Sequence, residues 1–194
     1  FIARFDADDL MSKDRLEKQI NFLKQNSDVV VIGGQCVLID ENDKIIGEKK
    51  FPLKDNEIKE SGFYLMSLQA GSMMINRKKL PENFTYYSTK YRFAEDHELL
   101  FKLFQYGKVA NLPDVLLFYR QHESNSIKQV NSKSVFRSIC AIRFNTIKRG
   151  YKPTIKSFTL CLLQLIIVNF IPEKLIPMVF AILRGTTQPL QISK

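Results

Sequence analysis

Two clusters of acidic residues are the parts of this sequence whose types and spacing could do chemistry. The first follows a short apolar run at the start of the chain and contains Asp6, Asp8 and Asp9. Carboxylates this close raise one another's pKa unless a cation or hydrogen bonds compensate their charge. Side chains alternate along a strand, so Asp6 and Asp8 are expected on one side, where both could address one hard divalent ion. The alternative is an acidic turn before a helix, where the helix dipole stabilises aspartate.

The second cluster is Glu-Asp-His-Glu at residues 95–98, which opens a predicted helix with an apolar face at Leu99, Leu100 and Leu103. Asp96 could act as a general base at the mouth of a cleft. Acids at the start of a helix also complement its dipole, which is a purely structural reason to find them there. Sequence spacing does not decide between these two interpretations.

A third polar segment leaves the end of a predicted strand, with Arg120 and His122 followed by Ser124 and Ser126. An arginine and a histidine beside hydroxyl groups would suit a diphosphate and its metal ion. The alternative is that His122 is a surface or capping residue.

Regular elements surround these clusters. Leu16, Ile20 and Leu23 recur at helical spacing after Ser12, a candidate N-cap, and Val29–Ile32 reads as a buried strand that ends at Gly33 and Gly34. The other predicted elements are a hairpin around 41–43, a short helix near 55–59, strands at 71–75, 109–112 and 115–119, and helices over about 130–149, 158–171 and 174–183.

A loop rich in aromatic residues, over 84–93, precedes the second acidic cluster. Exposed tyrosines on such a loop could bind a flat or sugar-like ligand, and plain packing is the alternative. The three cysteines stand in apolar settings without a C-x-x-C pair, which favours reduced structural thiols.

Positive charge is concentrated in the last third of the chain. The net charge is +9, and every acidic residue except Glu173 lies before residue 125. The apolar run over 158–171 is too short to span a bilayer, and its Lys and Arg neighbours fit an interfacial anchor on an anionic membrane. Packing on the domain, or on a part of it that precedes residue 1, is the alternative. Nucleic acid is not expected, because the basic residues alternate with aliphatic rather than exposed aromatic side chains.

Taken in order, the motifs resemble the inverting family 2 glycosyltransferases with the GT-A fold, common in bacterial polysaccharide assembly. The resemblance covers residues 1–127. It rests on Asp6-Ala7-Asp8-Asp9 after a strand, Arg15-Leu16-Glu17-Lys18-Gln19 in a helix, Gly33 after a strand, Gly71-Ser72-Met73-Met74, Ala94-Glu95-Asp96-His97-Glu98-Leu99, Asn111-Leu112-Pro113, and Tyr119-Arg120-Gln121-His122 with Ser126.

The resemblance implies an α/β fold of the GT-A, Rossmann-like type with a mixed sheet over 1–127 and a helical extension over 128–194. It also implies that Asp6-Ala7-Asp8 is the D-x-D motif. Asp8 would then ligate Mn²⁺ or Mg²⁺, and Asp6 would contact the nucleotide ribose or the metal shell. Asp96 would be the base that deprotonates the acceptor hydroxyl, and Glu95 would orient it or contact the acceptor.

The two remaining site residues follow from the same resemblance. His122 matches a position that serves in some members as a further metal or diphosphate contact, and Arg120 lies beside it as a candidate contact to the donor.

The implied reaction moves a sugar from a nucleotide-diphosphate donor to a hydroxyl of a saccharide or lipid-linked saccharide, with inversion. The implied location is the cytoplasm, at the inner face of the cell membrane. The family's first nucleotide-binding strands are absent here, so we expect an N-terminally truncated domain that does not bind a sugar nucleotide tightly by itself. A catalytically inactive interaction domain on the same fold is the alternative.

Overall fold

Two long neighbouring strands, β3 (Val29–Ile39) and β6 (Lys108–Arg120), run parallel at the centre of the sheet. The computed structural model describes residues 1–91, 93–121, 132–176, 178–179 and 182. The strand order is β1-β5-β3-β6-β2, with β4 (Ile45–Lys49) paired to β3 off this path. The short strands β1 (Ile2–Ala3), β2 (Leu10–Met11) and β5 (Met74–Ile75) pair antiparallel with their neighbours. This mixed sheet confirms the α/β class.

Strand β3 passes straight through Gly33 and Gly34, so the prediction that it ends there is wrong. A Cβ atom at Gly33 would lie 2.5 Å from Asn111 Oδ1, and one at Gly34 would lie 2.5 Å from Leu116 Cδ1. The two glycines therefore let neighbouring side chains pack across the strand rather than turn the chain. Strand β6 is likewise continuous where two strands were predicted, and it contains Pro113.

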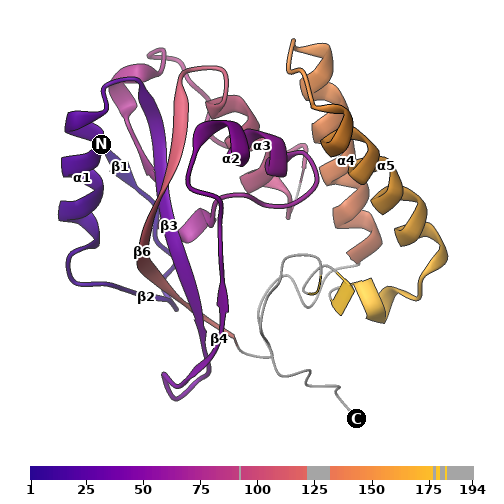
Figure 1. Cartoon of the computed structure of the whole chain (residues 1–194), viewed down its shortest axis with the longest axis horizontal. Coiled ribbons are helices and arrows are strands. Elements are labelled where there is room, and N and C mark those ends of the chain that lie inside the picture. Colours follow the sequence, from indigo (N-terminus) through magenta and orange to yellow (C-terminus); the bar gives the residue numbers. More distant parts are fainter. Residues whose placement is uncertain (92, 122–131, 177, 180–181, 183–194) are drawn as a thin grey trace.

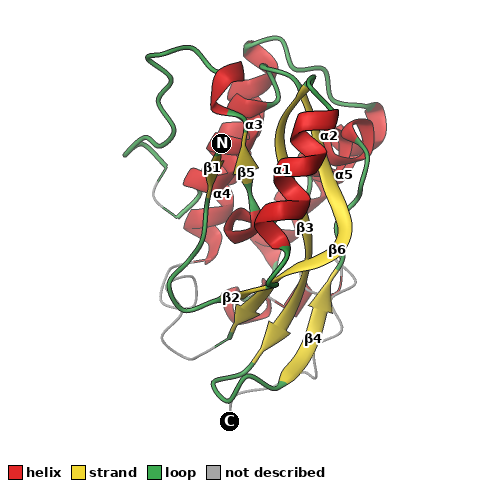
Figure 2. Cartoon of the chain, turned by 90° about the vertical axis from the view of Figure 1, so that its left-hand side faces the viewer, coloured by secondary structure: helices red, strands yellow, loops and turns green. Residues whose placement is uncertain are grey.

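Helices cover both faces of the sheet (Figures 1 and 2). Helix α1 (Arg15–Gln25) lies on one face, and α2 (Asp55–Gly62) and α3 (Glu95–Leu103) lie on the other. A small core cluster around Leu23, Ile32 and Met74 lies under α1. A larger one lies under α2 and α3, so most of the apolar core is on that face.

Helix α1 buries only part of the predicted face. Leu23 is buried and Ile20 packs against the core, as predicted, but Leu16 is exposed, and Arg15 and Gln19 are buried in addition. The Gln19 amide donates to the carbonyls of Ile32 (3.2 Å) and Ser72 (2.8 Å), so polar side chains bind the backbone where apolar packing was expected. The helix also begins after Asp14, not at Ser12.

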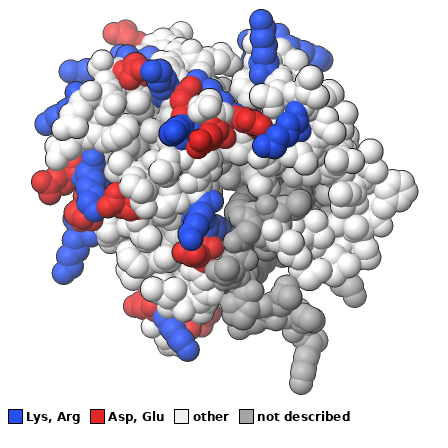
Figure 3. Space-filling view, in the orientation of Figure 1, with Lys and Arg blue, Asp and Glu red and all other residues white. Residues whose placement is uncertain are grey.

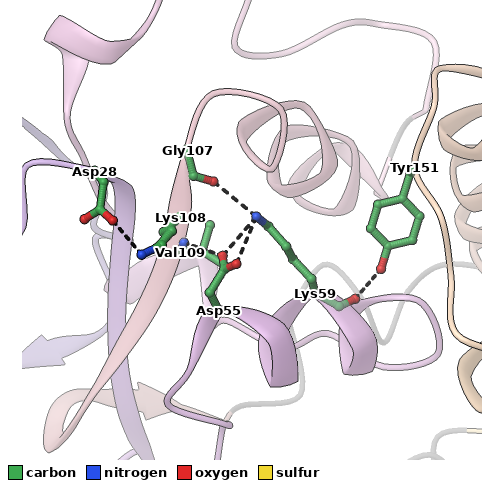
Figure 4. Close-up of polar contacts among 7 residues, drawn as sticks. All are labelled: Asp28, Asp55, Lys59, Gly107, Lys108, Val109 and Tyr151. Atoms are coloured by element: carbon green, nitrogen blue, oxygen red, sulfur yellow. Dashed lines mark hydrogen bonds and ion pairs between the residues drawn. The ribbon is translucent and has the colours of Figure 1, made fainter.

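A polar network fixes α2 between the sheet and the C-terminal helices (Figure 4). Asp55 accepts a hydrogen bond from the Val109 N–H at 2.8 Å and pairs with Lys59 at 3.0 Å. Lys59 also donates to the Gly107 carbonyl at 3.3 Å, and its own carbonyl accepts from the Tyr151 hydroxyl at 2.5 Å. The predicted short helix therefore connects the sheet to the C-terminal helices.

The C-terminal helices α4 (Ser132–Lys148) and α5 (Ile155–Phe170) pack on the α/β part, followed by a 3-10 turn at Glu173–Leu175. Ile142 and Cys161 share the larger core cluster, and the Tyr151 ring stacks on Phe63 with centroids 5.7 Å apart. The packing alternative is thus correct for their inner faces. Among the described helices, none is both long and apolar enough to cross a bilayer.

Two further predictions concern the last helix and the three cysteines. The predicted helix over 174–183 lies partly outside the described residues. All three cysteines lie within the described residues, where they are buried and form no disulfide with one another, as predicted for structural thiols.

Candidate functional site

Arg4 joins the two acidic clusters, which lie far apart in the sequence. Its Nη1 atom donates a hydrogen bond to the Asp96 carboxylate, and its Nη2 atom lies 3.6 Å from Asp6 Oδ1. Its guanidinium carbon lies 5.7 Å from the centre of the Tyr87 ring. The structure therefore brings Asp6 and Asp96 to one place through an arginine that the sequence analysis missed. Its position just before Asp6 was the available signal.

The first acidic cluster forms a turn rather than a strand end. Strand β1 stops at Ala3, and the Asp9 N–H donates to the Asp6 carbonyl at 3.2 Å. Alternation along a strand is therefore the wrong reason to place Asp6 and Asp8 on one side. Asp6 is half-buried, Asp8 is exposed and Asp9 is buried, so the three carboxylates occupy different environments.

Gly71 packs closely against two of these carboxylates. The point that a Cβ atom at Gly71 would occupy lies 3.1 Å from Leu117 Cδ2 and 3.3 Å from both Asp6 Oδ2 and Asp9 Oδ2, so a side chain there would crowd these atoms. Within the described part of the chain, the buried Asp9 Oδ2 has no hydrogen-bond partner. Carboxylate oxygens of Asp6 and Asp9 therefore both lie next to Gly71.

Asp9 has the most perturbed carboxylate of the acidic turn. Burial raises its pKa to about 6, and the nearby charges of Asp8 and Asp6 add to this against the hydrogen bond from Arg120. An ionised carboxylate that is buried and only half satisfied is costly without a compensating cation. Asp9 is therefore a residue whose ionised form a bound cation would favour.

A fully buried arginine lies beneath the turn. Arg15 Nη2 donates to the Arg4 carbonyl at 2.6 Å, while its buried Nη1 finds no acceptor among the described residues. Burial lowers the pKa of Arg15, and the charges of Asp6 and Asp9 oppose this shift. Helix α1 thus places a positive charge behind the acidic turn and fixes the backbone of Arg4.

Arg120 holds the acidic turn against the β3–β4 loop. Its Nε atom donates to the Asp8 carbonyl at 2.7 Å, and its backbone N–H donates to Asp9 Oδ1 at 2.9 Å. Its guanidinium also donates to the Asp40 carbonyl at 2.9 Å and pairs with Asp43 at 2.6 Å. These contacts position the turn. Contact of Arg120 with a donor stays a prediction, and His122 lies outside the described residues.

Glu95 and Asp96 open helix α3, as predicted, directly after Phe93 and Ala94. Burial raises the pKa of Asp96, and the charge and hydrogen bond of Arg4 oppose this shift. Glu95 Oε2 is buried without a hydrogen-bond partner in the described structure. Dipole complementarity alone would explain acids in this turn, but it does not explain why Asp96 contacts Arg4.

The aromatic residues of the 84–93 loop do not all have the same role. Some pack against other side chains and one lies at the site, so each of the two interpretations of the sequence applies to part of the loop. Phe84 packs edge-on against Tyr86 and Tyr106, and Tyr91 is buried and accepts a hydrogen bond from Asn145 at 2.7 Å. Tyr87 is partly exposed and faces Arg4. Packing therefore explains most of the loop, and Tyr87 is the aromatic side chain that lies at the site.

The chemistry of the donors fits a hard divalent cation. In the parts of the chain that the structure describes, no three His, Cys, Asp or Glu side chains form a ready metal-binding group. Mg²⁺ is commonly held by only one or two carboxylates, together with substrate phosphates and water. Asp6 and Asp9, whose carboxylate oxygens both lie next to Gly71, supply two such carboxylates.

The family model described as Glycosyl transferase family 2 matches residues 1–85. This segment is similar to a glycosyl transferase family 2 domain. The matched segment contains Arg4, the acidic turn, Arg15 and Gly71, and the six-stranded mixed sheet is consistent with a GT-A-like domain.

Curated relatives extend this similarity beyond the matched segment. The chain is 27% identical over 139 residues to an uncharacterized glycosyltransferase of Haemophilus influenzae, which covers 68% of this chain and 43% of that protein. It is 31% identical over 120 residues to the amylovoran biosynthesis glycosyltransferase AmsE of Erwinia amylovora, and this match covers 61% of this chain and 44% of that protein. An uncharacterized glycosyltransferase of Methanocaldococcus jannaschii is 28% identical over 139 residues, with 70% and 47% covered. The chain therefore spans less than half the length of these relatives.

Proposed function

We propose that this chain forms the metal and acceptor part of a glycosyltransferase, which moves a sugar from a nucleotide-diphosphate donor to an acceptor hydroxyl with inversion. The observation that carries the proposal is the contact of Arg4 with both Asp6 and Asp96. It links the family-matched acidic turn to a half-buried carboxylate on α3 that lies outside the matched segment.

Asp96 is the proposed base. Its carboxylate accepts the proton of the acceptor hydroxyl as that oxygen attacks the sugar carbon from the face opposite the leaving diphosphate. Arg4 favours the ionised form of Asp96, since its charge opposes the effect of burial on the pKa of that carboxyl. Glu95 would orient Asp96 or contact the acceptor. Inversion in a single displacement requires no covalent enzyme nucleophile.

The acidic turn is the proposed cation site, with Mn²⁺ or Mg²⁺ as the ion. Asp6 and Asp9, whose carboxylate oxygens both lie next to Gly71, would hold it together with substrate phosphates and water. Direct ligation by Asp8, which the D-x-D resemblance implies, remains part of the proposal. When bound, the ion neutralises the charge that develops on the leaving diphosphate. Arg120 and His122 remain proposed contacts to the diphosphate or its metal.

The biological setting is proposed from the relatives. AmsE is described as an amylovoran biosynthesis enzyme, which supports a role in cell-surface polysaccharide or glycolipid synthesis with a saccharide or lipid-linked acceptor. We place the protein in the cytoplasm, at the inner face of the cell membrane. The division into a 1–127 part and a 128–194 extension remains part of the proposal.

The test is release of nucleoside diphosphate from a panel of sugar nucleotides with Mn²⁺ and a mixture of saccharide acceptors. A nucleotide-binding segment from a relative is fused before residue 1, because the donor pocket is expected there. Asp96→Asn should lower the rate by about 100-fold or more, as for loss of a general base. Asp114→Asn, on a surface residue paired with Lys18, is the matched control and should retain the parent rate.

Equal rates for Asp96→Asn and the parent would refute the base assignment. Absence of turnover with every donor would favour the alternative, a catalytically inactive interaction domain on the same fold.

A further inference from the structure

The exposed face of helix α5 is apolar and its buried face is partly polar. This is the reverse of what is typical of a helix on a water-exposed surface. Its buried residues are Ser157, Cys161, Gln164 and Val168, which recur every three or four positions. Its exposed face carries large aliphatic and aromatic side chains: Ile155, Phe158, Leu162, Leu163, Ile166, Ile167 and Phe170. Ile155 is 89% exposed and Phe170 84%, so the apolar face extends over the whole helix.

Hydrogen bonds nevertheless hold the inner, partly polar face of α5, although the buried Nε of Arg143 has no partner among the described residues. Gln164 accepts a hydrogen bond from the buried Arg143 at 3.2 Å, and the Arg143 guanidinium also lies 3.8 Å from the Cys161 sulfur. The Thr154 hydroxyl caps the helix by accepting from the Ser157 N–H at 3.1 Å. These contacts specify which side of α5 faces α4, so the outward orientation of the apolar side chains is a feature of the fold.

Basic residues gather at one end of this apolar face. Lys148 is exposed at the end of α4, and Arg149 and Lys152 are exposed in the connection to α5. Lys156, in the first turn of α5, is also exposed and pairs with Glu60 at 3.3 Å. No acidic residue occurs between Glu123 and Glu173. Figure 3 shows the surface over α5, at the right of the view, free of charged side chains, with basic ones above it.

We infer that the exposed face of α5 is the surface by which this chain binds an anionic lipid bilayer. Scattered exposed apolar residues need no explanation, but a contiguous patch marks an interaction site. The adjacent positive charge favours anionic headgroups over the same face of a second copy of this chain, which would bring like charge to the contact.

The geometry sets how deep the contact reaches. A helix of 16 residues is about 24 Å long, shorter than the roughly 30 Å hydrocarbon core, so α5 lies in the plane of the interface. Its apolar side chains enter the headgroup and acyl boundary while α4 stays on the protein side. This narrows the sequence-based hypothesis from the whole basic extension to one helix face.

The experiment is vesicle co-sedimentation of the 194-residue chain, with phosphatidylcholine vesicles compared with mixed phosphatidylcholine and phosphatidylglycerol vesicles. The parent should bind the anionic vesicles more tightly, and increasingly so at low salt. Ile166→Asp should reduce the bound fraction by about ten-fold or more, because it puts a carboxylate into the lipid boundary. Ile45→Asp is the matched control: Ile45 is 61% exposed and Ile166 55%, and Ile45 lies on β4, away from α5.

A second readout does not depend on introducing charge. The chain contains no tryptophan, so Leu163→Trp gives a single reporter on α5 and Ile45→Trp a matched one on β4. Emission from Trp at 163 should shift to the blue with anionic vesicles and be quenched by brominated lipids, while emission from Trp at 45 should not change.

Two outcomes would overturn the inference. One is binding of Ile166→Asp equal to the parent. The other is self-association of the parent at micromolar concentration without vesicle binding, which would identify a second copy as the occupant. Neither result depends on sugar transfer, so failure here leaves the proposed reaction untouched.

Discussion

At the scale of single residues, Asp9 shows how the structure changes the interpretation of the acidic turn. The D-x-D resemblance directs attention to Asp6 and Asp8. The structure adds Asp9, which is buried and whose Oδ2 lacks a hydrogen-bond partner among the described residues. Residue types predicted a cluster of carboxylates, but only the fold distinguishes the exposed member from the buried one.

Asp9 should make the stability of the metal-free chain fall as pH rises. Its folded-state pKa is raised to about 6 from the ordinary value of 3.8, so between these values the folded chain binds more protons than the unfolded chain. Stability contributed by the protonated group is then lost as pH rises through this window, by about 3 kcal/mol at most. Asp9→Asn lacks this loss, so in chelator its stability relative to the parent should increase from pH 4 to pH 8 in urea unfolding.

Asp28→Asn is a control for which the pH dependence of stability should have the opposite sign. A hydrogen bond from Lys108 lowers the pKa of Asp28, so this variant should lose stability relative to the parent as pH rises from 3 to 6. A difference between Asp9→Asn and the parent that stays constant with pH would contradict the burial of an ionisable Asp9.

At the scale of secondary-structure elements, apolar periodicity predicted where helices and strands occur better than where they end. The helix that begins at Glu95 and the hairpin that leads into β4 were predicted from pattern and turn residues. Gly33 and Gly34 were misread as a strand end, because a glycine that admits a neighbour's side chain looks the same in sequence as one that turns the chain. The burial of Arg15 and Gln19 in α1 was not predicted for a related reason. Both side chains bind backbone carbonyls of distant segments.

Gly34→Ala should destabilise the chain by about 1–3 kcal/mol, the usual cost of overpacking a core. The added Cβ would lie 2.5 Å from both Cγ and Cδ1 of Leu116, within the β3–β6 contact. Urea unfolding measures the loss. In a Leu116→Ala background the same change should cost clearly less, since the clashing atoms are gone. An equal cost in both backgrounds would show that packing against Leu116 is not the cause.

At the scale of the whole molecule, the C-terminal helices and the α/β part share one core. Ile142 and Cys161 belong to the same cluster as Phe63 and Leu99, and Tyr151 links α2 to the α4–α5 connection. Sequence alone left open whether the extension packs on the domain or binds a membrane. The structure supports packing for the inner faces, and the outer face of α5 carries the separate lipid-binding inference.

Shared packing predicts that the chain unfolds as one cooperative unit. In urea, the fluorescence of Leu163→Trp on α5 and of Ile45→Trp on β4 should change with the same midpoint, coincident with the loss of far-ultraviolet circular dichroism. Two separated transitions, with the α5 reporter unfolding first, would show instead that the extension is an independent unit.

The central claim is that Arg4 and Asp96 act together in one reaction centre with the acidic turn. A double-mutant cycle on the rate of nucleoside diphosphate release tests it most directly, with Arg4→Met, Asp96→Asn and the combined variant in the fused protein. Arg4 is proposed to act through the ionisation of Asp96, so Arg4→Met should slow the parent and shift the acid limb of its pH–rate profile to higher pH. In the Asp96→Asn background it should cost little. Equal losses in both backgrounds, with the acid limb unmoved, would contradict the account.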